Sequence, residues 1–276
     1  MTAVLQYSLV NGIKCYSPGE LTQYADYPDS GFDLTDKLEQ ESFWVRSRNR
    51  LLKELIGRYK RARSQTRLLE IGCGTGGFIR EIAGDSDLKI TGSEIYLKGL
   101  VYAREKLPGV DFIQFDVKQG RLPDEFDIIA AFDVIEHIDD DIVAIANIHE
   151  MLSSGGHLIV TVPQHRFLWS RLDEIVRHKR RYSRNDLLAK LRGREFEIRY
   201  CSSFLFTLFP LMALSRLLDR GKSDTQSAEA EFELRVRFPR ALNWAFDKLM
   251  RIDELLIARG VSLPYGGTLL AVARKR

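Results

Sequence analysis

Cysteine is scarce in this sequence, and long apolar runs are absent from it. The three cysteines, Cys15, Cys73 and Cys201, lie far apart and form no CxxC pair, which argues against a zinc ribbon or a disulfide framework. Reduced thiols of this kind are typical of the cytosol. No stretch of about 18 uncharged apolar residues occurs, so no membrane-spanning helix is predicted.

Net charge and a targeting segment are also lacking. The formal net charge is only +3 over 276 residues, which by itself does not indicate a nucleic-acid-binding protein. The first residues, MTAVLQYSLVNGIK, show no basic start followed by an apolar stretch, so no signal peptide is predicted. We therefore expect a cytoplasmic protein without nucleic acid as a partner. The sequence does not indicate an oligomeric state.

Short apolar runs alternate with helical patterns after an irregular lead-in over residues 1–40. Seven strands are predicted at 67–71, 88–94, 110–116, 126–132, 157–162, 196–201 and 268–274. Helices are predicted at 41–59, 77–83, 97–106, 140–152 and 242–257. This alternation indicates a mostly parallel sheet with right-handed crossovers. Residues 41–276 are thus expected to form one domain, with a helical insertion at about 204–267 and a mobile loop at 221–231.

A glycine-rich turn follows the first predicted strand. In LLEIGCGTGGF the strand ends on Glu70, and glycines 72, 74 and 77 match the GxGxxG pattern. Glycine allows a positive φ and the close approach of a ligand to the backbone. An acid, Glu94, stands about 20 residues further on, as in dinucleotide-binding folds. The loop alone therefore leaves a methyltransferase and a NAD-dependent Rossmann oxidoreductase open.

Five motifs in order resemble those of class I S-adenosylmethionine-dependent methyltransferases. They are EIGCGTG, Glu94 in TGSEI, Asp116 in IQFDV, FDVIEHI at 132–138 and LSSGGHLIVTVP at 152–163. The resemblance implies a Rossmann-like three-layer α/β sandwich, with a mostly parallel seven-stranded sheet and an antiparallel C-terminal strand. It also implies S-adenosylmethionine as the cofactor. In the family the acid at Glu94 binds both ribose hydroxyls, and the position of Asp116 reads the adenine amino group.

An aromatic and basic element upstream of the glycine turn adds to the predicted cofactor site. Phe43, Trp44 and Arg48 resemble the FW-x-x-x-R element of one bacterial branch of the family. Arg48 could pair with the cofactor carboxylate, or the segment could be a helix with an aromatic core face and solvated arginines. The predicted cofactor-binding residues are Trp44, Arg48, Glu70, Gly72, Cys73, Gly74, Gly76, Glu94, Ile95, Asp116, Val117 and Asp133.

Three histidines near the strand ends are candidate general bases. They are His137, His165 and His178, and an imidazole suits proton transfer at neutral pH. The segment from Asp133 to His137 resembles the E-x-x-E-H motif of some methyltransferases that bind a divalent metal, with Asp in place of the first Glu. Many metal-free members carry similar residues, so we assign no metal ligand from the sequence.

A basic element after the fifth core strand predicts the acceptor site. The segment from Trp169 to Ser183 resembles the W-S-x-x-D-x-x-x-x-H-x-R-R-Y-S element of the same bacterial branch, which is often linked to polysaccharide, lipid or natural-product assembly. Ser183 begins an S-x-x-D signature of a helix start. The predicted substrate-binding residues are Arg177, His178, Arg180, Arg181 and Tyr182, which would hold an anionic group of the acceptor; a solvated charge run is the other interpretation.

The most apolar segment of the chain is residues 204–218, FLFTLFPLMALSRLL. It is too short to span a bilayer, which leaves a buried helix or pocket cover, or a surface helix in peripheral contact with a membrane. The predicted function is methyl transfer to a small-molecule or lipid- or glycan-linked acceptor at oxygen. An RNA or protein methyltransferase and a catalytically silent scaffold are the other possibilities.

Overall fold

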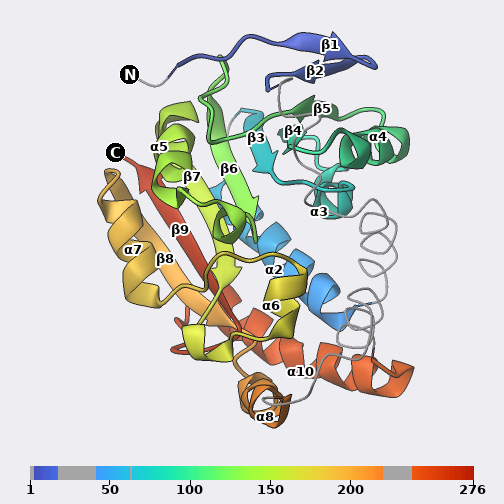
Figure 1. Ribbon diagram of the computed structural model, residues 1–276, viewed down its shortest axis with the longest axis vertical. Coiled ribbons are helices and arrows are strands. Elements are labelled where there is room, and N and C mark those ends of the chain that lie inside the picture. Colours follow the sequence, from blue (N-terminus) through green and yellow to red (C-terminus); the bar gives the residue numbers. More distant parts are fainter. Residues whose placement is uncertain (1–2, 18–41, 63, 220–237) are drawn as a thin grey trace.

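The computed structural model of the protein describes residues 3–17, 42–62, 64–219 and 238–276 (Figure 1). In the first half of the chain its elements are β1 (Ser8–Val10), β2 (Ile13–Cys15), α2 (Phe43–Tyr59), β3 (Thr66–Ile71), α3 (Gly77–Ile82), β4 (Leu88–Glu94), α4 (Leu97–Lys106), β5 (Asp111–Gln114) and β6 (Phe126–Phe132). In the second half they are η2 (Ile135–His137), α5 (Asp141–Met151), β7 (Leu152–Pro163), η3 (Arg166–Leu168), α6 (Arg171–Ile175), α7 (Arg184–Arg192), β8 (Phe196–Phe204), α8 (Phe209–Asp219), α10 (Arg240–Ala258) and β9 (Thr268–Lys275).

One twisted sheet runs through the molecule in the order β1-β2-β5-β4-β3-β6-β7-β9-β8. The strands β5, β4, β3, β6 and β7 are parallel neighbours, and β9 runs antiparallel to both β7 and β8. The predicted fold class and the antiparallel C-terminal strand are therefore confirmed. All seven predicted strands are present, with ends displaced by five residues at most.

The described residues form nine strands rather than seven, because β1 and β2 add a hairpin at one edge of the sheet. The prediction of an irregular stretch was wrong for residues 8–15. A two-residue turn at Asn11 and Gly12, with φ angles of 51° and 73°, connects the two strands. Asn-Gly is the most favourable pair for such a hairpin, so the signal was present in the sequence. Residues 18–40 of the predicted lead-in lie outside the described residues.

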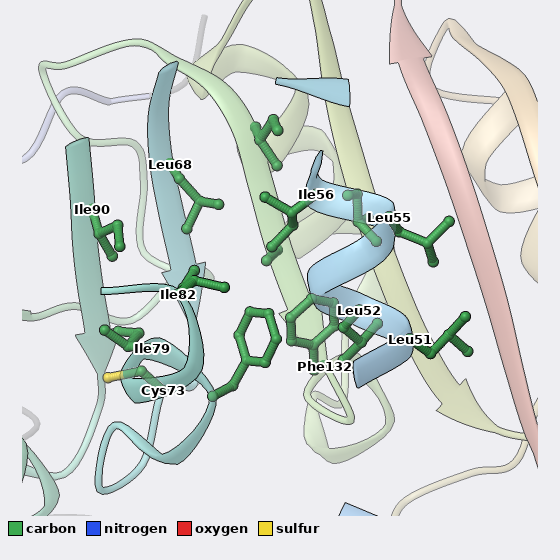
Figure 2. Packing of buried hydrophobic residues seen from close by; sticks show 14 of the residues in the cluster. Leu51, Leu52, Leu55, Ile56, Leu68, Cys73, Ile79, Ile82, Ile90 and Phe132 are labelled. Carbon is green, nitrogen blue, oxygen red and sulfur yellow. The ribbon is translucent and has the colours of Figure 1, made fainter. Parts of the chain in front are cut away.

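Helices cover both faces of the sheet and bury its apolar side chains. One face packs against α2, α3, α4 and α10, and the other packs against α5 and α7. Figure 2 shows Leu52 and Ile56 of α2 directed at the strands that carry Leu68 and Phe132. Because parallel strands are buried on both faces, they read as continuous apolar runs, as β6 does with every residue buried.

The apolar segment 204–218 is divided between the core and the surface. Phe204 and Leu208 are buried, whereas Leu211 and Leu214 on α8 are each 51% exposed. Within residues 3–17, 42–62, 64–219 and 238–276 we find no helix whose length and hydropathy would allow it to cross a bilayer. The predicted mobile loop at 221–231 lies outside the described residues.

Helix α10 is anchored to α2 by a polar network. The guanidinium group of Arg50 donates to Asp247 at 3.0 Å and to Glu254 at 2.5 Å. The Phe43 N–H donates to the Asn243 side chain at 2.8 Å. These contacts hold α10, the helix of the predicted insertion, against α2 of the core domain.

Candidate functional site

The glycine turn between β3 and α3 is strained in a way that requires glycine. Gly72, Gly74 and Gly76 have φ angles of 72°, 55° and 79°. A Cβ on Gly72 would lie 2.5 Å from the Val134 Cγ2 atom, so this glycine also permits close packing of two loops. A Cβ on Gly74 would face open space, which leaves the backbone there accessible to a ligand.

Three buried carboxylates lie at the carboxyl ends of successive strands. Glu70, Glu94 and Asp116 are 4%, 9% and 4% exposed at the ends of β3, β4 and β5. The carboxyl ends of parallel strands meet at one edge of a sheet, where ligands of this fold bind. A carboxylate can accept hydrogen bonds from two ligand hydroxyls or from an amino group. This set of hydrogen-bond acceptors therefore fits an adenine nucleoside.

Glu94 connects this edge to the glycine turn. Its carboxylate accepts from the Gly74 N–H at 3.0 Å and from the Ile95 N–H at 2.7 Å. Burial raises the pKa of Glu94, and the hydrogen bonds from the backbone of Ile95 and Gly74 oppose that rise. Val117, the remaining predicted residue after β5, packs in the core at 4% exposure.

Helix α2 contributes a cation to the same edge. The Arg48 Nη1 atom lies 2.8 Å from the Asp133 Oδ2 atom, and the guanidinium group stacks 4.8 Å over the Trp44 ring. Asp133 follows β6 with a φ of 56°, a strained conformation that is common at functional sites. The structure thus brings Trp44 and Arg48 of α2 together with Asp133, which lies 85 positions from Arg48 along the chain.

A carboxylate and a histidine form an oriented pair beside Asp133. The Asp173 Oδ1 atom lies 2.8 Å from the His178 Nδ1 atom. Arg181 donates to both Asp173 oxygens, at 2.7 Å and 3.0 Å. Although burial alone raises the pKa of Asp173, the hydrogen bonds from His178 and Arg181 outweigh it and hold that pKa well below its ordinary range. The pair directs His178 Nε2 toward Glu136, whose Oε1 atom is 3.8 Å away.

Glu136 is a completely buried carboxylate at the end of β6. Neither of its oxygens has a hydrogen-bond partner within the described residues. Burial, and secondly the charge of Asp133, raise its pKa well above the ordinary value. Its nearest companions are the histidines, with the rings of His137 and His178 4.8 Å apart.

His137 is held in its neutral form. Although part of its surface is exposed, the protein around the ring and the neighbouring His178 lower its pKa to about 4. One ligand atom each from Glu136, His137 and His178 lies within 4.8 Å of the others. Two imidazoles and a carboxylate are ligands that zinc and iron accept, so this cluster could hold a metal ion, although the sequence assigned none.

His165 occupies a separate, aromatic part of the site. It follows β7 with a φ of 64°, and its ring lies 5.1 Å from Phe167 and 5.7 Å from Phe209. Burial, and secondly the charge of Arg181, lower its pKa. Phe209 also contacts Tyr265 at 5.1 Å. These side chains form an apolar wall at the carboxyl end of the sheet.

Most of the predicted substrate-binding residues form ion pairs or hydrogen bonds with buried carboxylates. Arg180 lies 3.1 Å from Asp141, and the buried Tyr182 hydroxyl donates to the same carboxylate at 2.6 Å. Arg181 is paired with Asp173 as described above. Arg177 is exposed, with a φ of 58°. Most of the cluster therefore stabilises the loop before α7, and its contact with an acceptor stays a prediction.

Two residues of the site were overlooked by sequence reasoning, namely Asp173 and Glu136. Both lie inside segments whose motifs were recognised: Asp173 is the acid of the W-S-x-x-D element, and Glu136 precedes His137. The constant spacing of the Asp and the His in that element was a usable signal for their pairing. The predicted helix start at Ser183 is confirmed, since its hydroxyl accepts from the Asp186 N–H at 3.1 Å.

A hollow of about 400 Å³ lies elsewhere, at the amino ends of the strands. Its lining includes Lys14, Lys89 and Arg104. Because ligands of this fold bind at the carboxyl ends, we do not count this hollow as part of the site.

Comparison with known sequences identifies the family of this chain. A family model described as a methyltransferase domain matches residues 39–218. The chain is 28% identical over 101 residues to a ubiquinone biosynthesis O-methyltransferase of Pseudomonas aeruginosa, covering 34% of this chain and 43% of that protein. It is 26% identical over 147 residues to malonyl-acyl-carrier-protein O-methyltransferase 1 of Ilyobacter polytropus, covering 50% and 55%. It is 29% identical over 100 residues to phosphoethanolamine N-methyltransferase 3 of Arabidopsis thaliana, covering 34% and 20%. The chain thus spans about half the length of these relatives, or less.

Solved structures show the same fold. Phosphoethanolamine N-methyltransferase 2 of Haemonchus contortus, in complex with S-adenosyl-L-methionine, has a TM-score of 0.59 at 19% identity and covers 93% of this chain and 59% of that chain. A methyltransferase solved with the Haloferax volcanii Trm112 methyltransferase activator has a TM-score of 0.58 at 15% identity and covers 91% and 96%. At these identities the likeness concerns the fold alone.

Proposed function

Because this chain belongs to the methyltransferase-domain family and uses S-adenosylmethionine as its cofactor, we propose that it transfers a methyl group to an oxygen of a small or lipid- or glycan-linked acceptor. Residues 41–276 form the catalytic domain in this proposal, with residues 204–267 as an insertion. Two of the three relatives named above are O-methyltransferases by name. The proposal of oxygen rests on them and on the geometry of His178.

The cofactor is assigned to the strand ends that carry Glu94 and Asp116. Glu94 would accept from the ribose hydroxyls and Asp116 from the adenine amino group, over the glycine turn. Arg48, Trp44 and Asp133 would hold the amino-acid end. The sulfonium cofactor supplies an activated methyl group, so the protein needs chiefly to orient the acceptor, an effect that can contribute up to about 7–11 kcal/mol.

The pairing of His178 with Asp173 is the observation that carries the proposal. A carboxylate that accepts from Nδ1–H leaves Nε2 unprotonated, and this tautomer is assigned from the hydrogen bond. His178 Nε2 would take the proton from the acceptor hydroxyl as its oxygen forms a bond to the methyl carbon and the bond from that carbon to the sulfonium sulfur breaks, which leaves the demethylated cofactor. Asp173 stays ionised throughout, and Glu136 lies 3.8 Å from the same nitrogen, where a carboxylate would stabilise the imidazolium.

The test replaces His178 and measures turnover on a panel of hydroxylated acceptors. His178→Ala should lower kcat by about 10²–10⁴-fold, leave cofactor affinity unchanged, and recover activity when imidazole is added. His157→Ala is the matched control, because His157 lies in the middle of β7 against Tyr59 and not at its carboxyl end, and this variant should keep full turnover. Unchanged turnover in the His178 variant would refute the assignment of the base.

A metal requirement is a distinct outcome of the same assay. If a chelator abolishes turnover of the wild-type protein and a divalent cation restores it, Glu136, His137 and His178 act as ligands and His178 is not the base. A metal requirement would not contradict methylation at oxygen. If amine acceptors are added to the panel and only they are methylated, the proposal of an oxygen acceptor is overturned.

The predicted contact with an anionic acceptor is retained for the exposed part of the basic element. Arg177→Gln should weaken binding of an acidic acceptor without changing the Tm, because its side chain is exposed. Arg181→Gln should lower the Tm, because it separates a buried ion pair. If Arg177→Gln leaves acceptor affinity unchanged, the exposed end of the element is a solvated charge run.

A further inference from the structure

The outward face of α10 is unusually apolar for the surface of a soluble domain. Its exposed side chains include Trp244 at 63%, Ile252 at 50% and Leu255 at 52%. The opposite face of the helix, with Met250 and Ile257, is fully buried. At helical spacing, one side of α10 thus packs on the core while a second apolar side faces solvent.

Charge is segregated across the same helix. Asp247 and Glu254 turn inward and pair with Arg50 of α2. Asp253 is buried and accepts from the Phe206 and Thr207 N–H groups. All three carboxylates of α10 are thus held by the protein, although Glu254 also reaches Arg251 at 3.3 Å.

Cations remain on the outward face among the apolar side chains. Lys248, Arg251 and Arg259 are exposed there, and the Lys248 ammonium lies 5.8 Å from the centre of the Trp244 ring. Arginine, lysine and tryptophan beside leucine and isoleucine are typical of helices that lie in the interface of a bilayer. A binding partner that complements this face would be apolar and negatively charged.

Helix α8 also carries exposed apolar side chains. Leu211 and Leu214 are each 51% exposed, and the chain before α8 is attached to α10 through Asp253. Figure 1 shows α8 and α10 at the end of the molecule toward which β6 and β7 run. Phe209, at the start of α8, contacts the ring of His165, so this surface adjoins the wall of the candidate site.

We propose that α10, together with α8, docks this protein on an anionic phospholipid surface. A second copy of the chain is a poor occupant, because a symmetric dimer would place this face against itself and bring the cations of both copies together. A bilayer containing acidic lipids satisfies the cations and the apolar side chains at once. This inference stands independently of the methyl acceptor, and it moves the predicted membrane contact from residues 204–218 alone to a surface centred on α10.

The experiment uses the full chain with vesicles of phosphatidylcholine, with and without phosphatidylglycerol. Sedimentation should show binding only when phosphatidylglycerol is present. The tryptophan emission should shift to the blue on binding. Trp244→Phe should remove most of this shift while leaving sedimentation intact, since the chain has three tryptophans and Trp244 is 63% exposed.

Charge-reversal variants distinguish binding through the proposed face from binding that depends only on the net charge of the protein. The double variant Lys248→Glu with Arg251→Glu should lower the vesicle partition coefficient at least about tenfold, since each cation near an anionic surface contributes roughly a fivefold effect. The control is the double variant Arg192→Glu with Arg194→Glu, which reverses two exposed cations near the end of α7. This variant should retain binding.

Three results would overturn the proposal. One is equal binding to neutral and anionic vesicles, and another is equal loss in both double variants. The third is a concentration-dependent dimer in light scattering that the Lys248 and Arg251 changes abolish, which would make a second copy the occupant. Matching circular dichroism spectra and Tm values for all variants would show that each result reflects the surface and not unfolding.

Discussion

Single buried carboxylates govern the chemistry of this protein at the scale of residues. Glu94, Glu136 and Asp173 are each nearly or fully buried, but their surroundings differ. Glu94 accepts from backbone N–H groups and Asp173 pairs with Arg181, whereas Glu136 has no hydrogen-bond partner within the described residues and lies 3.8 Å from the His178 Nε2 atom. Burial raises the pKa of a carboxyl unless a cation or a hydrogen-bond donor compensates. The three carboxyl groups therefore differ in how readily they ionise.

Replacing Glu94 tests the assigned cofactor contact. Glu94→Ala should weaken binding of S-adenosylmethionine by about 2–4 kcal/mol, because hydrogen bonds to a charged group contribute roughly 1.5–3 kcal/mol each and are not additive. Isothermal titration calorimetry measures the loss. Glu94→Gln keeps an acceptor for the Gly74 N–H and should preserve the turn better. The exposed Glu105→Ala serves as the control, and an affinity within twofold of wild type in Glu94→Ala would refute the contact.

The titration of His137 tests the crowding of the histidines. Its pKa is lowered to about 4, first by burial and then by the positive charge of His178. Between its ordinary pKa near 6.5 and about 4, the unfolded chain takes up a proton that the native ring does not. The free energy of unfolding should therefore fall as the pH drops through this window.

Nuclear magnetic resonance of the imidazole protons measures this pKa directly. His137→Gln identifies the signal, and His178→Asn should raise the pKa of His137 by removing a neighbouring charge. A midpoint near 6.5 in the wild-type protein would mean that the ring is freely solvated.

At the scale of elements, the link between β7 and α7 depends on one side chain. Asp173 accepts from the Ser170 N–H and hydroxyl at the start of α6, from His178, and from Arg181. A single carboxylate thus fixes the short helix α6 and the loop that follows it. The fold of this link and the orientation of His178 are therefore coupled.

Asp173→Asn should destabilise this link. Removing one partner of a buried ion pair leaves a buried charge and costs about 3–5 kcal/mol, which denaturant-induced unfolding would detect. The low pKa of Asp173 stabilises the native state above the ordinary carboxyl range, and this contribution disappears as the pH falls toward the native value. The variant should therefore lose less stability on acidification than the wild type does.

Asp139→Asn is the control for that variant. The Asp139 side chain is 77% exposed beside Lys179, and a change at such a position usually alters stability by no more than about 0.5 kcal/mol. Equal stability of Asp173→Asn and Asp139→Asn would show that the Asp173 network does not hold the link together.

For the molecule as a whole, cofactor binding should be visible as stability. A ligand at about 100 times its Kd stabilises the native state by about 2.7 kcal/mol, so S-adenosylmethionine or its demethylated product should raise the Tm by several degrees. NAD at the same concentration should leave the Tm unchanged. A shift with NAD alone would contradict the assignment of the strand-end carboxylates.

Local patterns determined much of this fold in advance. All seven predicted strands, the helix α4 at 97–106 and the helix start at Ser183 were correct. Hydrophobic periodicity and capping depend on neighbours within a few residues. The hairpin at Asn11 and Gly12 was missed although it has such a local signal, because its strands are only three residues long.

By itself, the sequence determined the order of the strands and helices, the family, and the cofactor edge with its glycine turn. Tertiary structure alone decided that His178 lies against Glu136, that Arg48 reaches Asp133, and that α10 keeps its cations outward. His178 and Glu136 are 42 positions apart along the chain, and Arg48 and Asp133 are 85 positions apart. Arg50 and Glu254, which hold α10 against α2, are 204 positions apart. Their pairing is fixed by how the layers pack, because side chains so distant in sequence meet only once the sheet and its covering helices have formed.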